Sequence, residues 1–259
     1  DSGGIALGGV CFAAWFAYVD FIGIESQVGE SLLSTSAVRQ ELFGGLLVFD
    51  SFTAFLRLVL AGFLILYIAM TKLSGIPDRE DGADFYSLVL GSSLGMCLMV
   101  SANNLLMVFM AVEMASVPSY VLAGMLKGRP ASSEAALKYA VYGAGTAGVM
   151  LYGISLISGV LGTLVLPDIS YEMSRVLAAG GTSGSTMVLC LGGLMLSVGL
   201  AFKLSAVPFH FWCPDVFEGA AAEVGAFLSV ASKAAAIALL VRVAFAFSMP
   251  ASDTAVGMS

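Results

Sequence analysis

Long apolar runs constrain this chain more than any other feature. Seven runs recur at about 4–21, 46–70, 86–102, 105–126, 134–161, 186–212 and 220–247. A run of about 20 apolar residues is long enough to cross the hydrocarbon core of a bilayer. The backbone must then satisfy its own hydrogen bonds, which favours helices. Only 11% of the residues are charged, against about 25% in soluble domains. The sequence therefore predicts an all-α polytopic membrane protein with about seven transmembrane helices.

Polar segments separate the apolar runs and predict where the helices end. Residues 75–84 are the clearest loop, and the Asn103-Asn104 pair predicts a tight turn. Ser132 or Ser133 is expected to cap the fifth helix. Residues 162–185, rich in Gly, Ser and Thr, are expected to form a polar loop.

Loop lysines and arginines predict the orientation in the membrane. The loops after the second and fourth spans carry Lys72, Arg79, Lys127 and Arg129, whereas the opposite loops carry only Arg39 and Arg175. Because Lys and Arg accumulate on the inner side, the first set of loops should face the matrix or cytoplasm. The sequence contains no basic run that would predict binding to nucleic acid.

Five ionisable side chains interrupt the apolar spans or lie near their ends: Glu113, Lys138, Lys203, His210 and Lys233. A charge at mid-bilayer costs about 2.5–3.5 kcal/mol on insertion scales, so such residues usually face the bundle interior and mark a pathway. Glu113 has apolar neighbours on both sides and cannot easily reach the interface. The alternative for Glu113 is a neutral, hydrogen-bonded structural role.

Lys203 precedes Pro208 in the sixth run. Proline cannot donate to the carbonyl of Leu204, so we expect the helix to break just after the lysine. Transporter sites are often built on such discontinuous helices. Burial and a nearby carboxylate change a lysine's pKa in opposite directions, so a Glu–Lys pair would be a tunable proton site. The alternative is an ion pair that only holds two helices together.

The other three candidates also have two readings. Lys233 lies mid-span among small residues, which allow close approach of a neighbouring helix. Lys138 lies one turn after Glu134, and its alternative is to reach toward the interface. His210, the single histidine, either links the titrating groups or belongs to an interfacial aromatic belt. One histidine does not make a metal site.

Four ordered motifs resemble a known family. The stretch FKLSAVPFHFWCPDVFEGA at 202–220 resembles the signature of antiporter-like subunits of NADH:ubiquinone oxidoreductase, respiratory complex I. Its K-L-x-x-x-P-F-H-x-W-x-P-D core is also similar to multisubunit sodium/proton antiporters, whereas the VFEGA ending resembles subunit N (mitochondrial chain 2). The other three are SANNLL followed by VEMASVP at 101–118, EAALKY at 134–139 and ASK at 231–233.

The resemblance implies a role for each matched residue. Glu113 matches the buried glutamate that partners the broken-helix lysine, and Lys203 matches that lysine. Lys138 matches a lysine near the pair, Lys233 one that passes protons along the membrane, and His210 a histidine beyond the break. The resemblance implies no cofactor or metal in this chain; NADH, FMN, iron–sulfur clusters and ubiquinone would be bound by other subunits.

The resemblance also predicts the domain organisation. Residues 1–84 would form an N-terminal helix pair, 85–248 one antiporter-like five-helix proton-channel unit containing the proline-broken helix, and 249–259 a tail. Family members usually have about fourteen spans in two inverted repeats. We therefore expect this chain to be a fragment or a split or truncated subunit, with a companion chain supplying the second repeat. One departure is that Ala221 replaces the family's usual proline in Gly-Ala-Pro.

The leading hypothesis is thus a proton-translocating membrane-arm subunit of complex I, a non-redox part of the enzyme. Its expected partners are other membrane-arm subunits and lipids. Its expected location is the mitochondrial inner membrane, or else the bacterial plasma membrane. Three alternatives remain: a structural subunit with a relic half-channel, a subunit of a cation/proton antiporter or membrane-bound hydrogenase, and an unrelated secondary transporter.

Overall fold

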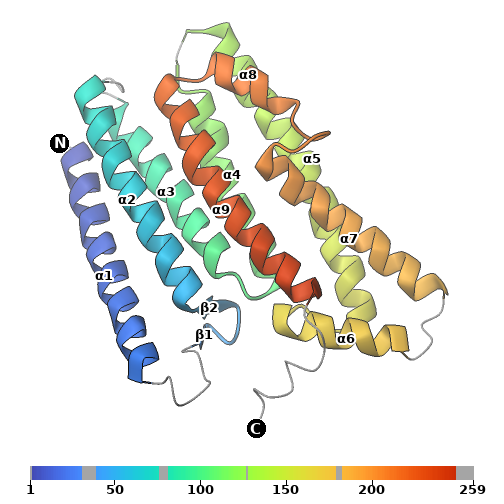
Figure 1. The fold of residues 1–259 in the computed structure, drawn as a ribbon. Helices are drawn as coiled ribbons and strands as arrows, with labels where there is room; N and C mark the ends of the chain where they lie inside the picture. Colours follow the sequence, from blue (N-terminus) through green and yellow to red (C-terminus); the bar gives the residue numbers. More distant parts are fainter. Residues whose placement is uncertain (1, 31–38, 76–80, 127, 179–182, 249–259) are drawn as a thin grey trace.

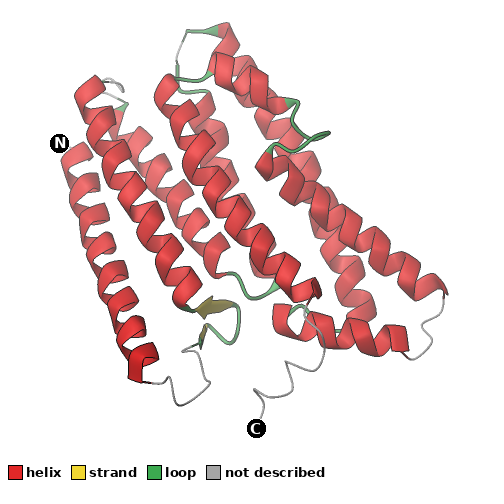
Figure 2. Cartoon of the chain, in the orientation of Figure 1, coloured by secondary structure: helices red, strands yellow, loops and turns green. Residues whose placement is uncertain are grey.

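The chain folds almost entirely into helices (Figure 2). The computed structural model describes residues 2–30, 39–75, 81–126, 128–178 and 183–248. The helices are α1 (Ser2–Glu30), α2 (Ser51–Ser74), α3 (Gly82–Ser101), α4 (Leu105–Ala123), α5 (Pro130–Leu161), α6 (Leu166–Ala178), α7 (Ser183–Leu204), α8 (Trp212–Gly219) and α9 (Ala222–Ser248). Two short strands are β1 (Gln40–Leu42) and β2 (Leu47–Phe49). Within these ranges, 7 helices are long and apolar enough to cross a membrane, which confirms the predicted polytopic fold.

The membrane helices form one continuous bundle (Figure 1). Helices α1, α2 and α3 lie side by side, and α9 runs along α3. Helix α5 packs against α4, α7 and α8. Helix α6 lies across the end of the bundle where α9 finishes. This arrangement surrounds the end of α7 with α4, α5, α8 and α9.

The second membrane helix begins later than predicted. Leu47–Phe49 belongs to strand β2, and α2 starts at Ser51. Asp50 is the N-cap, and its carboxylate accepts a hydrogen bond from the Thr53 backbone amide at 2.8 Å. Such a cap satisfies one of the amides that a helix start leaves without a partner.

The β1–β2 hairpin was not predicted. Its antiparallel strands pair Gln40 with Phe49 and Leu42 with Leu47. The turn places Phe43, Gly44 and Gly45 at positive φ, a conformation that two glycines adopt without steric cost. Strand β2 was counted as the start of the apolar run at 46–70, which hid the hairpin.

Helix α6 replaces the polar loop that was predicted for 162–185. Its Leu166 and Ile169 are buried, and Met173 and Val176 pack against the same core. This three-and-four spacing is that of an amphipathic helix. The prediction failed because Gly, Ser and Thr at the ends of the segment masked the periodicity between them.

Several other helix ends differ from the prediction. Helix α5 starts at Pro130, which fits the first turn of a helix, and Ser132 instead donates its hydroxyl to the Ala123 carbonyl at 3.0 Å. Neither predicted serine caps the helix. Helix α1 continues beyond the predicted end to Glu30. Asn104 does form the predicted turn, capping α4 through the Leu106 amide at 2.9 Å.

Close contact between α3 and α4 depends on Gly95. A Cβ atom there would lie 2.4 Å from the backbone nitrogen of Ala115. Small residues allow this approach, because van der Waals packing drives helix association in a bilayer. The contact holds α4, which carries Glu113, against the rest of the bundle.

Candidate functional site

The break after Lys203 is the centre of the candidate site. Helix α7 ends at Leu204, and Ser205 adopts a left-handed φ of 57°. The Ser205 amide donates to the Phe202 carbonyl at 3.0 Å, and the Ala206 amide donates to the Ala201 carbonyl at 2.8 Å. This pair of hydrogen bonds is a Schellman motif, a common way to end a helix.

The structure confirms the predicted break but corrects where the helix resumes. Pro208 lies in the turn that follows the Schellman motif, and α8 starts only at Trp212. The sixth membrane helix thus ends at Leu204 and not at 212 as predicted. The connection between Leu204 and Trp212 leaves room for side chains of other helices at the end of α7.

Two side chains from other elements cap the last turn of α7. The Trp212 indole Nε1 donates to the Phe202 carbonyl at 3.2 Å. The Lys233 ammonium, on α9, donates to the Lys203 carbonyl at 2.9 Å. Carbonyls at a helix end lack partners within the helix, so the break creates the acceptor that Lys233 uses.

Lys203 is buried, with 1% of its surface exposed. Its Nζ donates to the Ser116 hydroxyl on α4 at 2.9 Å. That hydroxyl donates in turn to the Val112 carbonyl at 2.5 Å, which leaves its lone pairs facing the ammonium. Ser116 is therefore the direct partner of Lys203, and sequence reasoning did not single it out.

Glu113 lies one helical turn before Ser116 on α4 and is half-buried. It interacts electrostatically with Lys203, but the described residues show no ion pair between the two. The predicted Glu–Lys pair is thus a pair of neighbouring charges with Ser116 on the same side of α4. The Ser116 hydroxyl contacts Lys203 and the Val112 carbonyl, and no hydrogen bond joins it to Glu113 among the described residues.

Lys233 contacts the break from the opposite side. Its ammonium also donates to the Ser205 hydroxyl and lies 4.9 Å from the Trp212 ring centroid. A cation over an indole face is stabilised by the ring quadrupole. The structure therefore places Lys233, Lys203 and Glu113 around the break.

Lys138 does not join this group directly. Its ammonium forms ion pairs with Glu134 at 2.7 Å and with Asp215 on α8 at 3.1 Å. The side chain is 35% exposed. Among the described residues, Lys138 forms no hydrogen bond or ion pair with Glu113 or Lys203; its ion pairs are with the carboxylates of α5 and α8.

Tyr139, the next residue, connects the two regions. Its ring stacks on Trp212 with centroids 4.3 Å apart and packs edge-on against Tyr120 of α4 at 4.6 Å. The aromatic contacts lie between the Lys138 ion pairs and the break.

His210 lies in the turn after the break. Its ring stacks on Phe211 with centroids 5.1 Å apart. Its buried Nδ1 has no hydrogen-bond partner among the described residues. The predicted link between His210 and Lys203 has no direct contact in the structure, because the turn carries the imidazole outside the α7 end.

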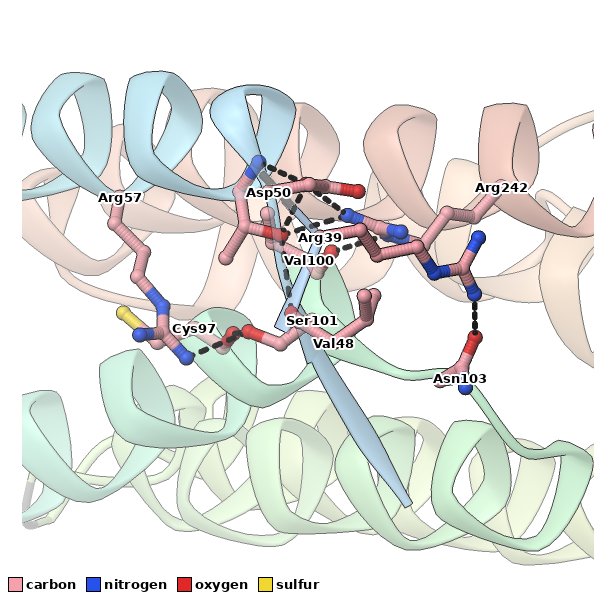
Figure 3. A network of polar contacts seen from close by, with 10 residues as sticks. Arg39, Val48, Asp50, Arg57, Cys97, Val100, Ser101, Asn103 and Arg242 are labelled. Carbon is pink, nitrogen blue, oxygen red and sulfur yellow. Dashed lines mark hydrogen bonds and ion pairs between the residues drawn. The ribbon is translucent and has the colours of Figure 1, made fainter. Parts of the chain in front are cut away.

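Two arginines inside the spans escaped sequence reasoning, although the same cost argument applies to them. Arg242 on α9 donates through Nη2 to Asp50 at 2.8 Å and through Nε to the Val100 carbonyl at 2.6 Å (Figure 3). Arg57 on α2 donates to the Ser101 hydroxyl at 2.6 Å. Both lie in apolar runs, and this alone could have identified them.

Asp50 is held as a carboxylate by this network. Burial acts to raise the pKa of Asp50, but the Arg242 guanidinium and the hydrogen bonds from Thr53 prevail and lower it. Arg242 thus joins the start of α2 to the end of α3 and to α9. Within the described ranges, no group of three or more His, Cys, Asp or Glu could hold a metal ion.

Comparison with known sequences places the chain in a family. Residues 102–256 match the family described as NADH:quinone oxidoreductase/Mrp antiporter, transmembrane. NADH-quinone oxidoreductase subunit N 2 of Sorangium cellulosum is 40% identical over 220 residues, which cover 83% of this chain and 43% of that protein. Subunit N of Rhizorhabdus wittichii is 38% identical over 255 residues, covering 96% of this chain and 50% of that protein. The chain spans about half the length, or less, of these relatives.

Solved structures show the same fold. Respiratory complex I from Thermus thermophilus with bound aureothin has a chain that is 30% identical, with a TM-score of 0.65 over 94% of this chain and 52% of that one. The membrane-bound sulfane sulfur reductase, an archaeal respiratory membrane complex, has a chain that is 19% identical, with a TM-score of 0.80 over 98% of this chain and 50% of that one. The Mrp complex from Dietzia sp. DQ12-45-1b has a chain that is 19% identical, with a TM-score of 0.74 over 94% of this chain and 43% of that one. At 19% identity, the similarity to the last two structures concerns the fold alone. The chain is an integral membrane protein that belongs to the NADH:quinone oxidoreductase/Mrp antiporter transmembrane family, as an antiporter-like protein of the subunit N type.

Proposed function

We propose that this chain is a proton-translocating membrane-arm subunit of NADH:quinone oxidoreductase. One observation carries the proposal: three ionisable side chains on α4, α7 and α9 converge where α7 breaks. Lys203 bonds to Ser116, and Lys233 bonds to the Lys203 carbonyl. Ionisable groups inside a membrane usually mark a proton or ion pathway.

The geometry suggests how the site moves protons. The ammonium groups of Lys203 and Lys233 interact electrostatically at the α7 break, and like charges oppose each other's protonation. Glu113 has the opposite effect on Lys203. A proton that arrives at Lys203 therefore favours release of a proton from Lys233. A change in the charge of Glu113 alters which of the two lysines is protonated. Quinone reduction elsewhere in the complex would drive that change.

The remaining parts of the proposal concern the other candidates and the partners. Lys138, through Asp215 of α8, and His210 in the turn would adjust the position of the break. Other subunits would bind NADH, FMN, the iron–sulfur clusters and ubiquinone, and the chain would perform no redox chemistry itself. Other membrane-arm subunits, lipids and a segment with the second helical repeat would surround it. The homologues are mostly bacterial, which favours a bacterial plasma membrane over the mitochondrial inner membrane.

The test is proton translocation by the assembled complex in sealed vesicles, driven by NADH. Lys203→Ala and Glu113→Gln should each lower proton translocation per NADH oxidised by the share that passes through this chain. Lys72→Gln, at the exposed end of α2, is the matched control and should leave it unchanged. Unchanged translocation in Lys203→Ala, with the complex assembled, would disprove the proposal.

The same experiment separates the alternatives. A structural subunit with a relic half-channel predicts lost assembly, but no change in protons moved by the complex that does assemble. A cation/proton antiporter subunit predicts sodium-dependent proton movement without NADH.

A further inference from the structure

A cavity at the end of the bundle is separate from the candidate proton site. It has a volume of about 380 Å³ and is lined by residues from α2, α3–α4, α6 and α9 and by Arg39 before β1. Cavities of about 300–1,000 Å³ are typical of small-molecule sites. Helix α6, which contributes to the lining, lies across the end of the bundle (Figure 1), so the cavity lies near one end of the membrane helices.

Among the described residues, the polar part of the cavity carries one positive charge more than its carboxylates balance. The lining contains Arg39, Arg242 and Asp50. Arg242 and Asp50 form an ion pair at 2.8 Å and balance each other. Arg39 instead donates to the neutral amide oxygen of Asn103 at 2.8 Å, as Figure 3 shows. The guanidinium of Arg39 therefore keeps its full charge and has further N–H donors available.

Ser170 of α6 also lines the cavity. The residue is 3% exposed, and its side chain has no hydrogen bond to another described residue. Its hydroxyl can therefore donate to a ligand in the cavity that carries an oxygen acceptor.

The opposite wall of the cavity is apolar. Phe52, Leu166, Val241, Phe245 and Ala246 line it. Phe245 is 59% exposed on α9, so the apolar wall continues onto the exposed surface of the bundle. The cavity thus combines a cationic end with an exposed hydrocarbon side.

We propose that this cavity binds one anionic phospholipid. Its phosphate would lie between the Arg39 guanidinium and the Ser170 hydroxyl, and an acyl chain would run along Phe245 and Val241. Arginine is well suited to phosphate because its planar N–H groups match the oxygens. A free phosphate would use the charged end alone and leave the apolar wall bare.

The test uses the full-length protein purified in its assembled complex and stripped of lipid. Phosphatidylglycerol, phosphatidylcholine with the same acyl chains, and inorganic phosphate are added separately. Lipid retention is measured by native mass spectrometry and stability by the unfolding temperature. The wild type should retain phosphatidylglycerol over phosphatidylcholine and gain stability from it alone.

The variants define the site. Arg39→Gln should lower the preference for phosphatidylglycerol by about fivefold, the effect of one basic residue near an anionic lipid surface. Arg39→Lys should retain part of the preference for phosphatidylglycerol, and Ser170→Ala should weaken that preference. Arg175→Gln is the matched control. Arg175 lies on α6, the helix that carries Ser170, but it does not line the cavity and pairs with Glu172 at 2.6 Å.

Four results would overturn the proposal. Equal retention of the two lipids, or an unchanged preference in Arg39→Gln, would exclude a headgroup site. Equal stabilisation by inorganic phosphate would assign the cavity to a small anion. Loss of a neighbouring subunit in Arg39→Gln, with lipid retention unchanged, would assign it to a protein carboxylate. Arg39 is exposed, so its substitution is expected to leave the fold intact.

Discussion

Lys233 donates a hydrogen bond to the backbone carbonyl of Lys203 over 2.9 Å. The ammonium of the half-buried Lys233 thus caps the helix that carries the buried Lys203. Because the acceptor exists only where α7 ends, the break and the pairing of α7 with α9 depend on each other. A change in the charge of Lys233 would directly change what holds the end of α7.

The left-handed conformation of Ser205 predicts an unusual order of stabilities. Ser205→Ala and Ser205→Gly both remove the hydroxyl that Lys233 contacts. A non-glycine residue in this conformation costs about 1–2 kcal/mol, so Ser205→Gly should be more stable than Ser205→Ala by about 1 kcal/mol. Chemical unfolding of the purified protein measures the difference.

Ser229 on α9 provides the matched control for this pair. It lies inside a regular helix and is exposed, with its hydroxyl on the Ala226 carbonyl at 3.0 Å. There the order should reverse, with glycine less stable than alanine by about 1 kcal/mol. The same order at both positions would contradict the structural role of Ser205.

The Ser116–Lys203 bond predicts a stability loss and a functional loss together. Ser116→Ala leaves the ammonium of Lys203 without its hydrogen-bond partner. An unsatisfied buried group costs about 1–3 kcal/mol, and proton translocation should fall with it. Ser116→Thr keeps the hydroxyl and should preserve both, as measured by unfolding and by NADH-driven proton uptake into vesicles.

Ser119 serves as the control for Ser116. It lies one turn further along α4, is equally buried, and bonds to Ser92 at 3.1 Å and not to a lysine. Ser119→Ala should reduce stability but leave proton translocation per NADH unchanged. If both alanine variants lower translocation equally, the hydroxyl of Ser116 has no specific role.

Asp50 predicts how stability changes with pH. Burial alone would raise the pKa of Asp50, but Arg242 and Thr53 lower it below the unfolded value. A lowered folded-state pKa stabilises the fold above the unfolded value, near 4, and this stabilisation disappears as the pH falls through the folded-state pKa. The unfolding temperature of the wild type should therefore fall between about pH 5 and pH 2.

The matched variants isolate this contribution. Asp50→Asn should be less stable at neutral pH, and its unfolding temperature should change less on acidification. Asp84→Asn removes an exposed carboxylate from the first turn of α3 and should keep the wild-type slope. If the unfolding temperature of Asp50→Asn falls with pH as steeply as that of the wild type, the ion pair between Asp50 and Arg242 is not the source of the pH dependence.

Gly95 predicts a strict size limit between α3 and α4. A Cβ atom would lie 2.4 Å from the Ala115 nitrogen, and backbone cannot move as a side chain can. Gly95→Ala should therefore reduce stability by about 1–3 kcal/mol. Gly62→Ala on α2 meets nothing within 4 Å and should be neutral or gain up to about 1 kcal/mol from helix propensity. Comparative unfolding of the two variants measures the contrast.

The apolar runs and the motif order predicted the membrane helices and the five candidate residues. Length and hydrophobicity are local properties, so no tertiary contact was needed to find α2, α3, α4 or α9. The break after Lys203 was also local, although its mechanism was not: the Schellman motif at Ser205 ends the helix before the proline is reached. The α6 segment was missed because its amphipathic pattern is short and lies between glycine-rich ends.

Only the tertiary structure decided which side chains meet. Ser116 and Lys203 come from helices far apart in the chain, and the sequence gives no signal that a serine rather than Glu113 accepts the hydrogen bond. Lys138 could reach either Glu113 or Asp215, and the packing of α8 on α5 decided for Asp215. The sequence by itself determined that charges lie within the membrane, because their cost is visible in any apolar run. Their partners were decided by helix packing, because distance and orientation between helices are not encoded at any single position.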